Sequence, residues 1–189
     1  RDKLRLPSDE FMFLFVGQHI WEKNLEFLLE ALAEIRTLPF RMYFIGSGYA
    51  ASELRRKTED LYLTDKVIFM GSITERERLK LYYAAADLFL FPSLYDNAPL
   101  VVREAAALHT PSLLIKGSTS AEVIHDSVNG FLSDNSVTAY ASRISQLLET
   151  PQLIAEAGEA ASHSIARSWE DVAEEVYDRY VNLIHRSGN

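Results

Sequence analysis

The chain has 189 residues, with 19 Lys or Arg and 27 Asp or Glu, which gives a formal net charge of −8 at pH 7. A hydrophobic share of 48% is typical of a folded globular protein, so the composition excludes a largely disordered chain. The acidic balance argues against nucleic acid as a partner, because binding to nucleic acid depends on Lys and Arg that neutralise phosphates. No apolar run reaches the ~18 residues that span a bilayer, and there is no cysteine. We therefore expect neither an integral membrane protein nor disulfide or thiolate chemistry.

Residues 1–10 are polar and irregular in pattern, and the chain starts at Arg1 without an initiator methionine or a signal-peptide pattern. We therefore expect them to be an irregular lead-in from a missing N-terminal domain. Residues 11–189 are then expected to form one domain with a helical tail.

From residue 11 onward, short apolar runs alternate with amphipathic segments. The runs are rich in Phe, Val and Ile and too short for helices, which predicts strands that are buried on both faces. These predicted strands cover 11–17, 41–46, 66–71, 86–93, 111–117 and 129–134. The predicted helices between them cover 24–38, 51–63, 75–86 and 100–109, and three more follow at 137–149, 151–167 and 168–186. The alternation predicts an α/β fold, a doubly wound, Rossmann-like parallel sheet with C-terminal helices.

In an open α/β sheet, ligands bind beyond the carboxyl ends of the strands, so the segments after each run contain the candidate site. After the first run, Lys23 lies where the loop 17–24 enters a helix. Backbone N–H groups at a helix start favour an anion such as phosphate, and a lysine adds a positive charge. The alternative is a solvated loop with an ordinary surface lysine.

The segment from Gly46 to Ala51 fits the GxGxxA pattern of dinucleotide-binding proteins. That pattern normally follows the first strand, and an acidic residue follows the next one. Here it follows the second strand, and the next strand ends at Met70 and Gly71 without an acid. We therefore expect a glycine-rich turn that serves a helix entry, in preference to a nicotinamide or flavin site.

Two acidic residues, Asp96 and Glu104, are eight positions apart in the segment that follows the fourth run. In a helix this spacing corresponds to about 12 Å, longer than the roughly 5–9.5 Å between the paired carboxylates of glycosidases. It suits one extended ligand held at two points, such as a nucleotide sugar, and the alternative is a helix-capping Asp with a surface Glu. The histidines have no metal-ligand spacing, and neither DxD nor GxSxG occurs. We therefore expect neither a metal site nor a serine hydrolase.

Several motifs follow one another in order along nearly the whole chain. They are Val16-Gly17-Gln18-His19 with Glu22-Lys23-Asn24, Leu81 to Ser93, Pro92 to Ala105, and Thr110 to Leu132. In this order and spacing they resemble the patterns VGRL…EKG, LYxxADLFLxPS, PSxxEGFGLVxxEA and GxPV…NGfL of the glycosyl transferases group 1, which are retaining enzymes of the GT-B fold. The resemblance covers residues 10–186 and implies the C-terminal, donor-binding half of such an enzyme.

The resemblance also implies roles for individual residues. Lys23 is expected to hold the donor diphosphate and to stabilise negative charge on the departing nucleotide. Asp96, in place of the commoner Glu, is expected to bind the donor sugar, and these two are the expected catalytic residues. Glu104 is expected to bind the ribose. The other expected donor-binding positions are Gly17, Gln18, Gly46, Phe69, Gly71, Asn97, Ala98, Pro99 and Leu100.

The sequence departs from the family pattern at three places. Gln18 stands where the family usually has Arg, Asp96 replaces Glu, and Ser118-Thr119 occupies the place of a Gly pair. These departures leave open a non-catalytic or degenerate nucleotide-binding or regulatory module. A GT-B-type sugar-nucleotide epimerase is a further alternative.

The function implied by the resemblance is transfer of a sugar from a nucleotide-diphosphate sugar, by default a UDP-sugar, to an acceptor hydroxyl. It implies retention, no metal or cofactor, and a role in polysaccharide or glycoconjugate biosynthesis. The acceptor site belongs to the missing N-terminal domain, so we expect this fragment alone to be inactive. The expected location is the cytoplasm, with peripheral association at the inner face of the membrane through the missing half. The last helix is expected to pack against that half through Val172, Val176, Tyr180 and Leu183, which leaves this face partly exposed here.

Overall fold

The computed structural model describes residues 1–7, 9–96, 100–166 and 169–187. Its centre is a six-stranded sheet in the order β3-β2-β1-β4-β5-β6, in which every pair of neighbouring strands is parallel. The strands are β1 (Phe11–Val16), β2 (Phe40–Ile45), β3 (Val67–Gly71), β4 (Leu88–Phe91), β5 (Ser112–Ile115) and β6 (Phe131–Ser133). The predicted doubly wound α/β fold is confirmed, and the strand order reverses between β1 and β4, where such sheets bind ligands.

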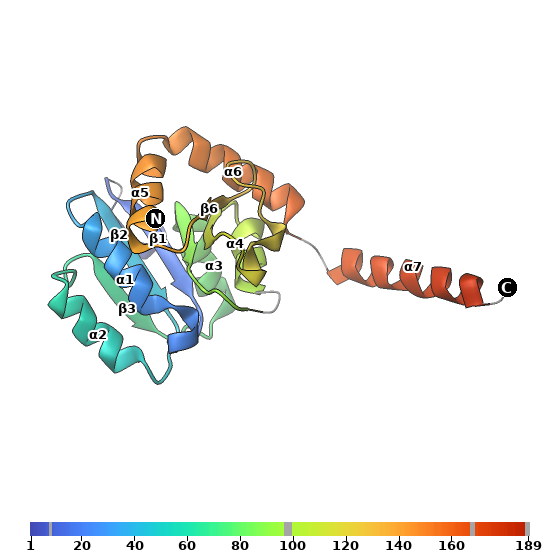
Figure 1. Cartoon of the computed structure of the whole chain (residues 1–189), viewed down its shortest axis with the longest axis horizontal. Coiled ribbons are helices and arrows are strands. Elements are labelled where there is room, and N and C mark those ends of the chain that lie inside the picture. The colour runs from blue at the N-terminus through green and yellow to red at the C-terminus, as the bar shows by residue number, and fades with distance from the viewer. Residues whose placement is uncertain (8, 97–99, 167–168, 188–189) are drawn as a thin grey trace.

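Helices connect the strands and cover the sheet (Figure 1). They are α1 (Leu25–Glu34), α2 (Ala51–Asp60), α3 (Arg76–Ala85), α4 (Leu100–Ala107), α5 (Val137–Leu148), α6 (Pro151–Ser164) and α7 (Trp169–Ser187). α1 packs between α2 and α5, whereas α4 packs between α3 and α6, as expected when right-handed crossovers place helices on both faces. Each predicted helix is present within a few residues.

Three short 3₁₀ helices were not predicted. They are Asp2–Leu4, Trp21–Lys23 and Thr119–Val123. The first lies inside the segment 1–10 that was expected to be irregular, and it ends at Arg5 with a φ of 53°. Such turns are too short to carry a hydrophobic period, which is the signal that sequence analysis depends on.

A row of phenylalanine rings crosses four strands of the sheet. Phe91 stacks on Phe15 with ring centroids 6.0 Å apart, Phe15 meets Phe44 at 5.8 Å, and Phe44 stacks on Phe69 at 5.0 Å. The first three side chains are almost fully buried. A buried Phe contributes about 1.5–3 kcal/mol, so this row stabilises the strands close to their carboxyl ends, where the loops of the candidate site begin.

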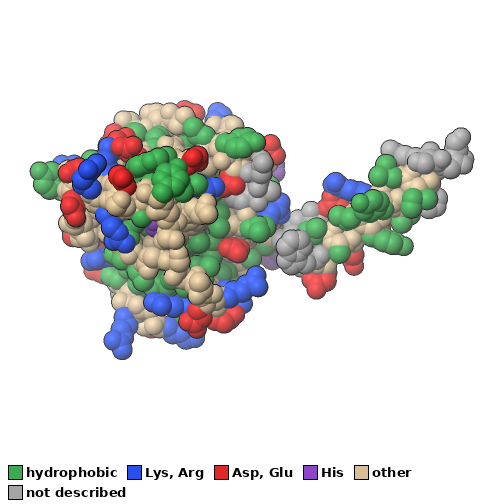
Figure 2. All heavy atoms as spheres, turned by 90° about the horizontal axis from the view of Figure 1, so that it is seen from below, with side chains coloured by type: hydrophobic (Ala, Val, Ile, Leu, Met, Phe, Trp, Pro, Cys, Tyr) green, Lys and Arg blue, Asp and Glu red, His purple; other side chains and the backbone are tan. Residues whose placement is uncertain are grey.

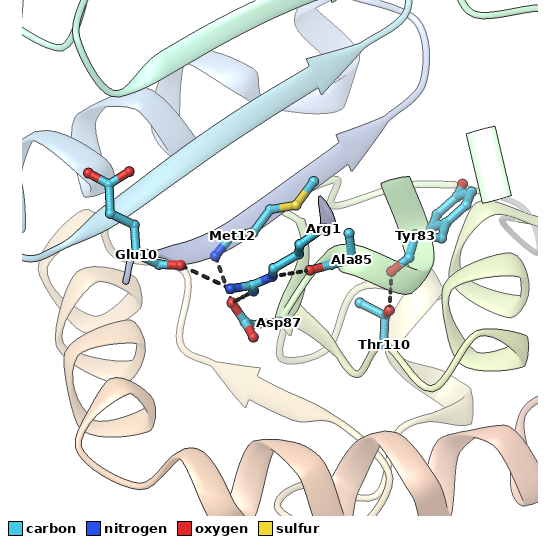
Figure 3. Close-up of polar contacts among 7 residues, drawn as sticks. All are labelled: Arg1, Glu10, Met12, Tyr83, Ala85, Asp87 and Thr110. Carbon is cyan, nitrogen blue, oxygen red and sulfur yellow. Dashed lines mark hydrogen bonds and ion pairs between the residues drawn. The ribbon is translucent and has the colours of Figure 1, made fainter. Parts of the chain in front are cut away.

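The amino end of the sheet is closed by a polar cluster around Asp87 (Figure 3). Asp87 accepts the Met12 N–H at 2.7 Å and forms an ion pair with the Arg1 guanidinium. Arg1 also donates to the Ala85 carbonyl at 3.0 Å and to the Glu10 carbonyl at 3.2 Å. These contacts tie the beginning of the chain to the starts of β1 and β4.

α7 lies apart from the rest of the domain (Figure 1). Hydrophobic side chains are visible along it in Figure 2, and Val176, Tyr180 and Leu183 are exposed by 44%, 64% and 58%, while Val172 is half-buried. The expectation of a partly exposed apolar face is therefore confirmed. Within the described parts of the chain, none of the helices combines the length and apolar character needed to cross a membrane.

Candidate functional site

The loops that follow β1 and β2 pack against each other through their backbones. The Gly17 N–H donates to the Ile45 carbonyl at 3.0 Å, and the His19 N–H donates to the Ser47 carbonyl at 3.0 Å. A β-carbon at Gly46 would lie 1.9 Å from the Gly17 carbonyl oxygen, closer than any real contact. Gly48 has the same relation to the His19 carbonyl, at 2.3 Å. Close packing of two loops therefore accounts for the glycines of the GxGxxA segment, in agreement with its interpretation as a structural turn.

Lys23 and Asp96, the two expected catalytic residues, form an ion pair between Nζ and Oδ2. They come from opposite sides of the strand-order reversal, because Lys23 follows β1 and Asp96 follows β4, 73 positions later. Their side chains are 19% and 21% exposed, and the ammonium also lies 5.7 Å from the centroid of the Phe91 ring. Partial burial reduces solvent screening, so this pair is stronger than an ordinary surface pair.

Two further contacts join the β1 loop to the β4 loop. Asn24 Nδ2 donates to the Pro92 carbonyl at 3.2 Å, and Ser93 Oγ shares its proton between the Tyr95 carbonyl at 3.1 Å and the Glu22 carbonyl at 3.4 Å. Asn24 has a φ of 57°, a left-handed conformation that Asn tolerates better than most residues, and it directs the chain into α1. The ammonium of Lys23 is thereby fixed at the carboxyl end of the sheet.

The loop after β5 holds the backbone of Asp96. Thr119 Oγ1 accepts the Asp96 N–H at 2.9 Å and donates to the Asp96 carbonyl at 2.9 Å. In the sequence, Thr119 stands out only as a departure from a Gly pair, and no local pattern indicates its contact with Asp96.

Glu104 lies on α4 and has a partner that sequence analysis missed. Tyr83 of α3 donates its hydroxyl to Glu104 Oε2 at 2.9 Å. Burial raises the pKa of the Tyr83 hydroxyl, and the Glu104 charge raises it further, so this group remains a hydrogen-bond donor well into alkaline pH. A pocket of about 160 Å³ lies beside the pair and is lined by Arg76, Leu79, Lys80, Tyr83, Glu104, Ala107 and Leu108.

Asp96 and Glu104 do not lie on one continuous helix, which corrects the distance expected from their spacing. Asp96 precedes α4, whose described part begins at Leu100, so the helical distance of about 12 Å does not apply to the whole span. The two carboxylates are instead fixed by separate partners, Lys23 for one and Tyr83 for the other.

The remaining expected donor-binding residues differ in their surroundings. Gln18 and Leu100 are exposed, and the position of a β-carbon at Gly71 has no atom within 4 Å. The Phe69 ring is half-buried. It stacks on the Phe44 ring, and the Arg55 guanidinium lies 4.7 Å from its centroid. Asn97, Ala98 and Pro99 lie outside the described residues.

His19 is a buried polar residue that sequence analysis treated only as part of a loop. Its ring lies among those of Phe15, Phe44 and Phe69, and its Nε2 has no hydrogen-bond partner among the described residues. Burial lowers the pKa of this imidazole, and the charge of Arg55 lowers it further, so His19 is neutral at pH 7. Across the described ranges, no group of three or more His, Asp or Glu side chains could hold a metal ion.

Comparison with known proteins places this arrangement in one family. The model of the family described as glycosyl transferases group 1 matches residues 1–164. D-inositol 3-phosphate glycosyltransferase 2 of Catenulispora acidiphila is 31% identical over 197 residues, which cover 97% of this chain and 46% of that protein.

Solved structures agree on the fold. Sucrose-phosphate synthase of Thermosynechococcus elongatus superposes with a TM-score of 0.85 at 28% identity, over 98% of this chain and 48% of that one. HepE of Anabaena, solved in complex with UDP and glucose, superposes with a TM-score of 0.81 at 21% identity, over 93% of this chain and 49% of that one. The chain thus spans about half the length of these relatives.

Proposed function

Since the chain belongs to the glycosyl transferases group 1 family, we propose that it is the donor-binding half of a retaining, metal-independent glycosyltransferase. The donor is a nucleotide-diphosphate sugar, with a UDP-sugar as the first candidate, and the acceptor is a hydroxyl group. The observation that carries the proposal is the Lys23–Asp96 pair, which unites the β1 and β4 loops where the strand order reverses.

Lys23 supplies the positive charge for the diphosphate. Lys23 precedes the first residue of α1 by two positions, and the first backbone N–H groups of this helix carry partial positive charge. A cation fixed at this place stabilises the charge that develops on the departing nucleotide diphosphate. In the free protein, this ammonium is paired with the Asp96 carboxylate.

Donor binding then exchanges the partners of the ion pair. The diphosphate takes the place of the Asp96 carboxylate at Lys23, and the carboxylate becomes free to accept hydrogen bonds from hydroxyl groups of the donor sugar. One contact in the free protein is replaced by two contacts to one ligand. Affinity for the sugar therefore depends on where the released Asp96 carboxylate points.

Glu104 binds the ribose at the other end of the donor. Its Oε2 accepts from Tyr83 and its side chain is exposed, which leaves acceptor capacity on the carboxylate for two neighbouring ribose hydroxyls. The pocket between α3 and α4 lies next to this position.

The remaining half of the enzyme supplies the acceptor site. Because this chain spans about half of its relatives, we propose that it binds the donor but transfers no sugar alone. We place the enzyme in the cytoplasm, or peripherally at the inner face of the membrane through the other half.

Calorimetric titration with UDP-glucose, GDP-mannose and ADP-glucose tests this function. We expect one of them to bind, and we expect Lys23→Ala and Glu104→Ala each to weaken it about 10–100-fold, because each removes a charge-assisted contact of about 1.5–3 kcal/mol. Arg41→Ala is the matched control, since Arg41 near the start of β2 also forms an ion pair, with Glu10, but at the amino end of the sheet. A folded wild-type protein that binds none of the three would contradict the proposal and favour a non-catalytic module.

A further inference from the structure

Asp96 is held by a single hydroxyl group from another loop. Thr119 Oγ1 accepts from the Asp96 N–H and donates to the Asp96 carbonyl, both at 2.9 Å. The same hydroxyl group thus donates a hydrogen bond to one backbone group of Asp96 and accepts one from the other. The Thr119 N–H adds a third bond between the segments, to the Leu94 carbonyl at 3.4 Å.

These bonds fix the direction in which the Asp96 side chain leaves the backbone. Leu94 to Asp96 belong to no helix or strand, so their backbone groups have no ladder of hydrogen bonds to order them. Fixing the peptide groups on both sides of a Cα atom fixes its Cα–Cβ bond, and only the side-chain torsions remain free. In the free protein those torsions are set by Lys23.

Thr119 itself is well suited to such a contact. It opens the 3₁₀ helix Thr119–Val123, which three residues separate from the end of β5, and the preceding Ser118 N–H donates to the Ile115 carbonyl at 3.1 Å, which anchors the loop to the sheet. Its β-branched side chain restricts χ1, which leaves few alternative positions for the hydroxyl. The neighbouring Ser118 and Ser120 are buried, so the loop is packed on both sides of Thr119.

We propose that Thr119 is a positioning residue that directs the Asp96 carboxylate to the donor-sugar hydroxyls. The inference rests on the proposed function, in which the diphosphate displaces Asp96 from Lys23. Once that ion pair is broken, the Thr119 contacts to the Asp96 N–H and carbonyl hold the direction of its carboxylate, beside the bond from Ser93 Oγ to the Tyr95 carbonyl at 3.1 Å. Thr119 therefore governs recognition of the sugar and not of the nucleoside diphosphate.

The test compares a nucleotide sugar with its nucleoside diphosphate. Whichever of UDP-glucose, GDP-mannose and ADP-glucose binds the wild type best is titrated beside the matching UDP, GDP or ADP. Thr119→Val is expected to weaken binding of the nucleotide sugar about tenfold and to leave binding of the nucleoside diphosphate unchanged. Thr119→Ser keeps the hydroxyl group, so it is expected to bind the nucleotide sugar as the wild type does. Thr58→Val is the matched control, because Thr58 is a buried threonine whose hydroxyl also bonds to a backbone carbonyl, that of Leu54.

A double-mutant cycle separates positioning from a general effect on folding. If Thr119 acts through Asp96, then Thr119→Val causes no further loss of affinity for the nucleotide sugar in an Asp96→Asn background. Equal losses for sugar and diphosphate, or an added loss in that background, would overturn the inference while leaving donor binding intact.

Hydrogen exchange tests the contact without any ligand. The Asp96 amide is expected to exchange faster in Thr119→Val and at the wild-type rate in Thr119→Ser. Unchanged exchange in Thr119→Val overturns the inference on its own. A wild type that binds no nucleotide sugar overturns the proposed function instead, and the sugar-recognition role falls with it.

Discussion

At the amino end of the sheet, the Asp87 carboxylate accepts both the Met12 N–H and the Arg1 guanidinium, and Arg1 reaches two further carbonyls (Figure 3). At the carboxyl end, Lys23 and Asp96 pair across two loops. Three of the four buried side-chain polar atoms without a partner among the described residues lie at this end: His19 Nε2, Ser118 Oγ and Ser120 Oγ.

The difference shows how one sheet separates stability from binding. Polar groups at the amino end satisfy one another, and such a saturated cluster contributes to the folded state alone. Polar groups at the carboxyl end keep capacity for a ligand, which costs stability in the free protein. Removal of the central carboxylate at each end should therefore change different measured quantities: folding stability for Asp87 and nucleotide affinity for Asp96.

The largest effect is expected where a side chain would separate the loops at the carboxyl end. Gly46→Ala places a methyl group 1.9 Å from the Gly17 carbonyl oxygen, at a φ of 139°, so we expect a loss of about 3 kcal/mol in the free energy of unfolding. Gly71→Ala is the comparison, because its β-carbon meets no atom within 4 Å and only its φ of 69° is unfavourable, at about 1 kcal/mol. Urea unfolding measures both, and equal losses would show that loop contact is unimportant.

The amino end is tested by Asp87→Ala. The change removes the acceptor of the Met12 N–H and the anionic partner of Arg1, so we expect a loss of about 2 kcal/mol. For a domain of this size this lowers the melting temperature by roughly 4–8 °C. Nucleotide affinity should not change, and a variant that melts normally but binds poorly would remove the distinction between the two ends.

A smaller effect of opposite sign is expected for Asp96→Asn at the carboxyl end. The amide no longer competes as an anion for Lys23, so UDP should bind about fivefold more tightly, equivalent to about 1 kcal/mol. The nucleotide sugar should lose its advantage over UDP in the same variant. Calorimetry measures both ligands, and weaker binding of UDP would show that Asp96 and the diphosphate do not exchange at Lys23.

An effect of similar size is expected at Tyr83, and it depends on pH. Because burial raises its folded-state pKa, the stability linked to this hydroxyl is complete below the unfolded-state pKa of about 10 and declines as pH rises above it. Tyr83→Phe should lose about 1 kcal/mol at pH 7 through the bond to Glu104, and the gap to wild type should narrow above pH 10. Urea midpoints at both pH values measure the gap. Tyr140, whose pKa is also raised by burial, is present in both proteins and leaves the difference unaffected. A constant gap would contradict the assignment.

The fold could be predicted because each element carries its own local signal. Runs such as Phe11–Val16 are apolar throughout and are followed by glycine, and α1 shows a helical stripe, so neither needs information from distant residues. The family followed from motifs in order, and the comparisons confirm it.

The sequence indicated which residues lie at the site but not how they contact one another. The roles assigned to these residues stay predictions. Lys23 and Asp96 were each identified beside a strand end, but their pairing joins positions 73 apart and depends on the strand order. Thr119 and Tyr83 carried no motif that pointed to their acidic partners, because each bond joins residues of different elements. The helical distance between Asp96 and Glu104 failed because α4 begins after Asp96.

The most direct test of nucleotide binding at the carboxyl end is the amide NMR spectrum of the chain, titrated with UDP, GDP and ADP. We predict that one nucleotide shifts resonances of Gly17 to Asn24 and of the first turns of α4, while those of Met12 and Asp87 stay in place. Shifts confined to the amino end, or none with any of the three nucleotides, would contradict the account.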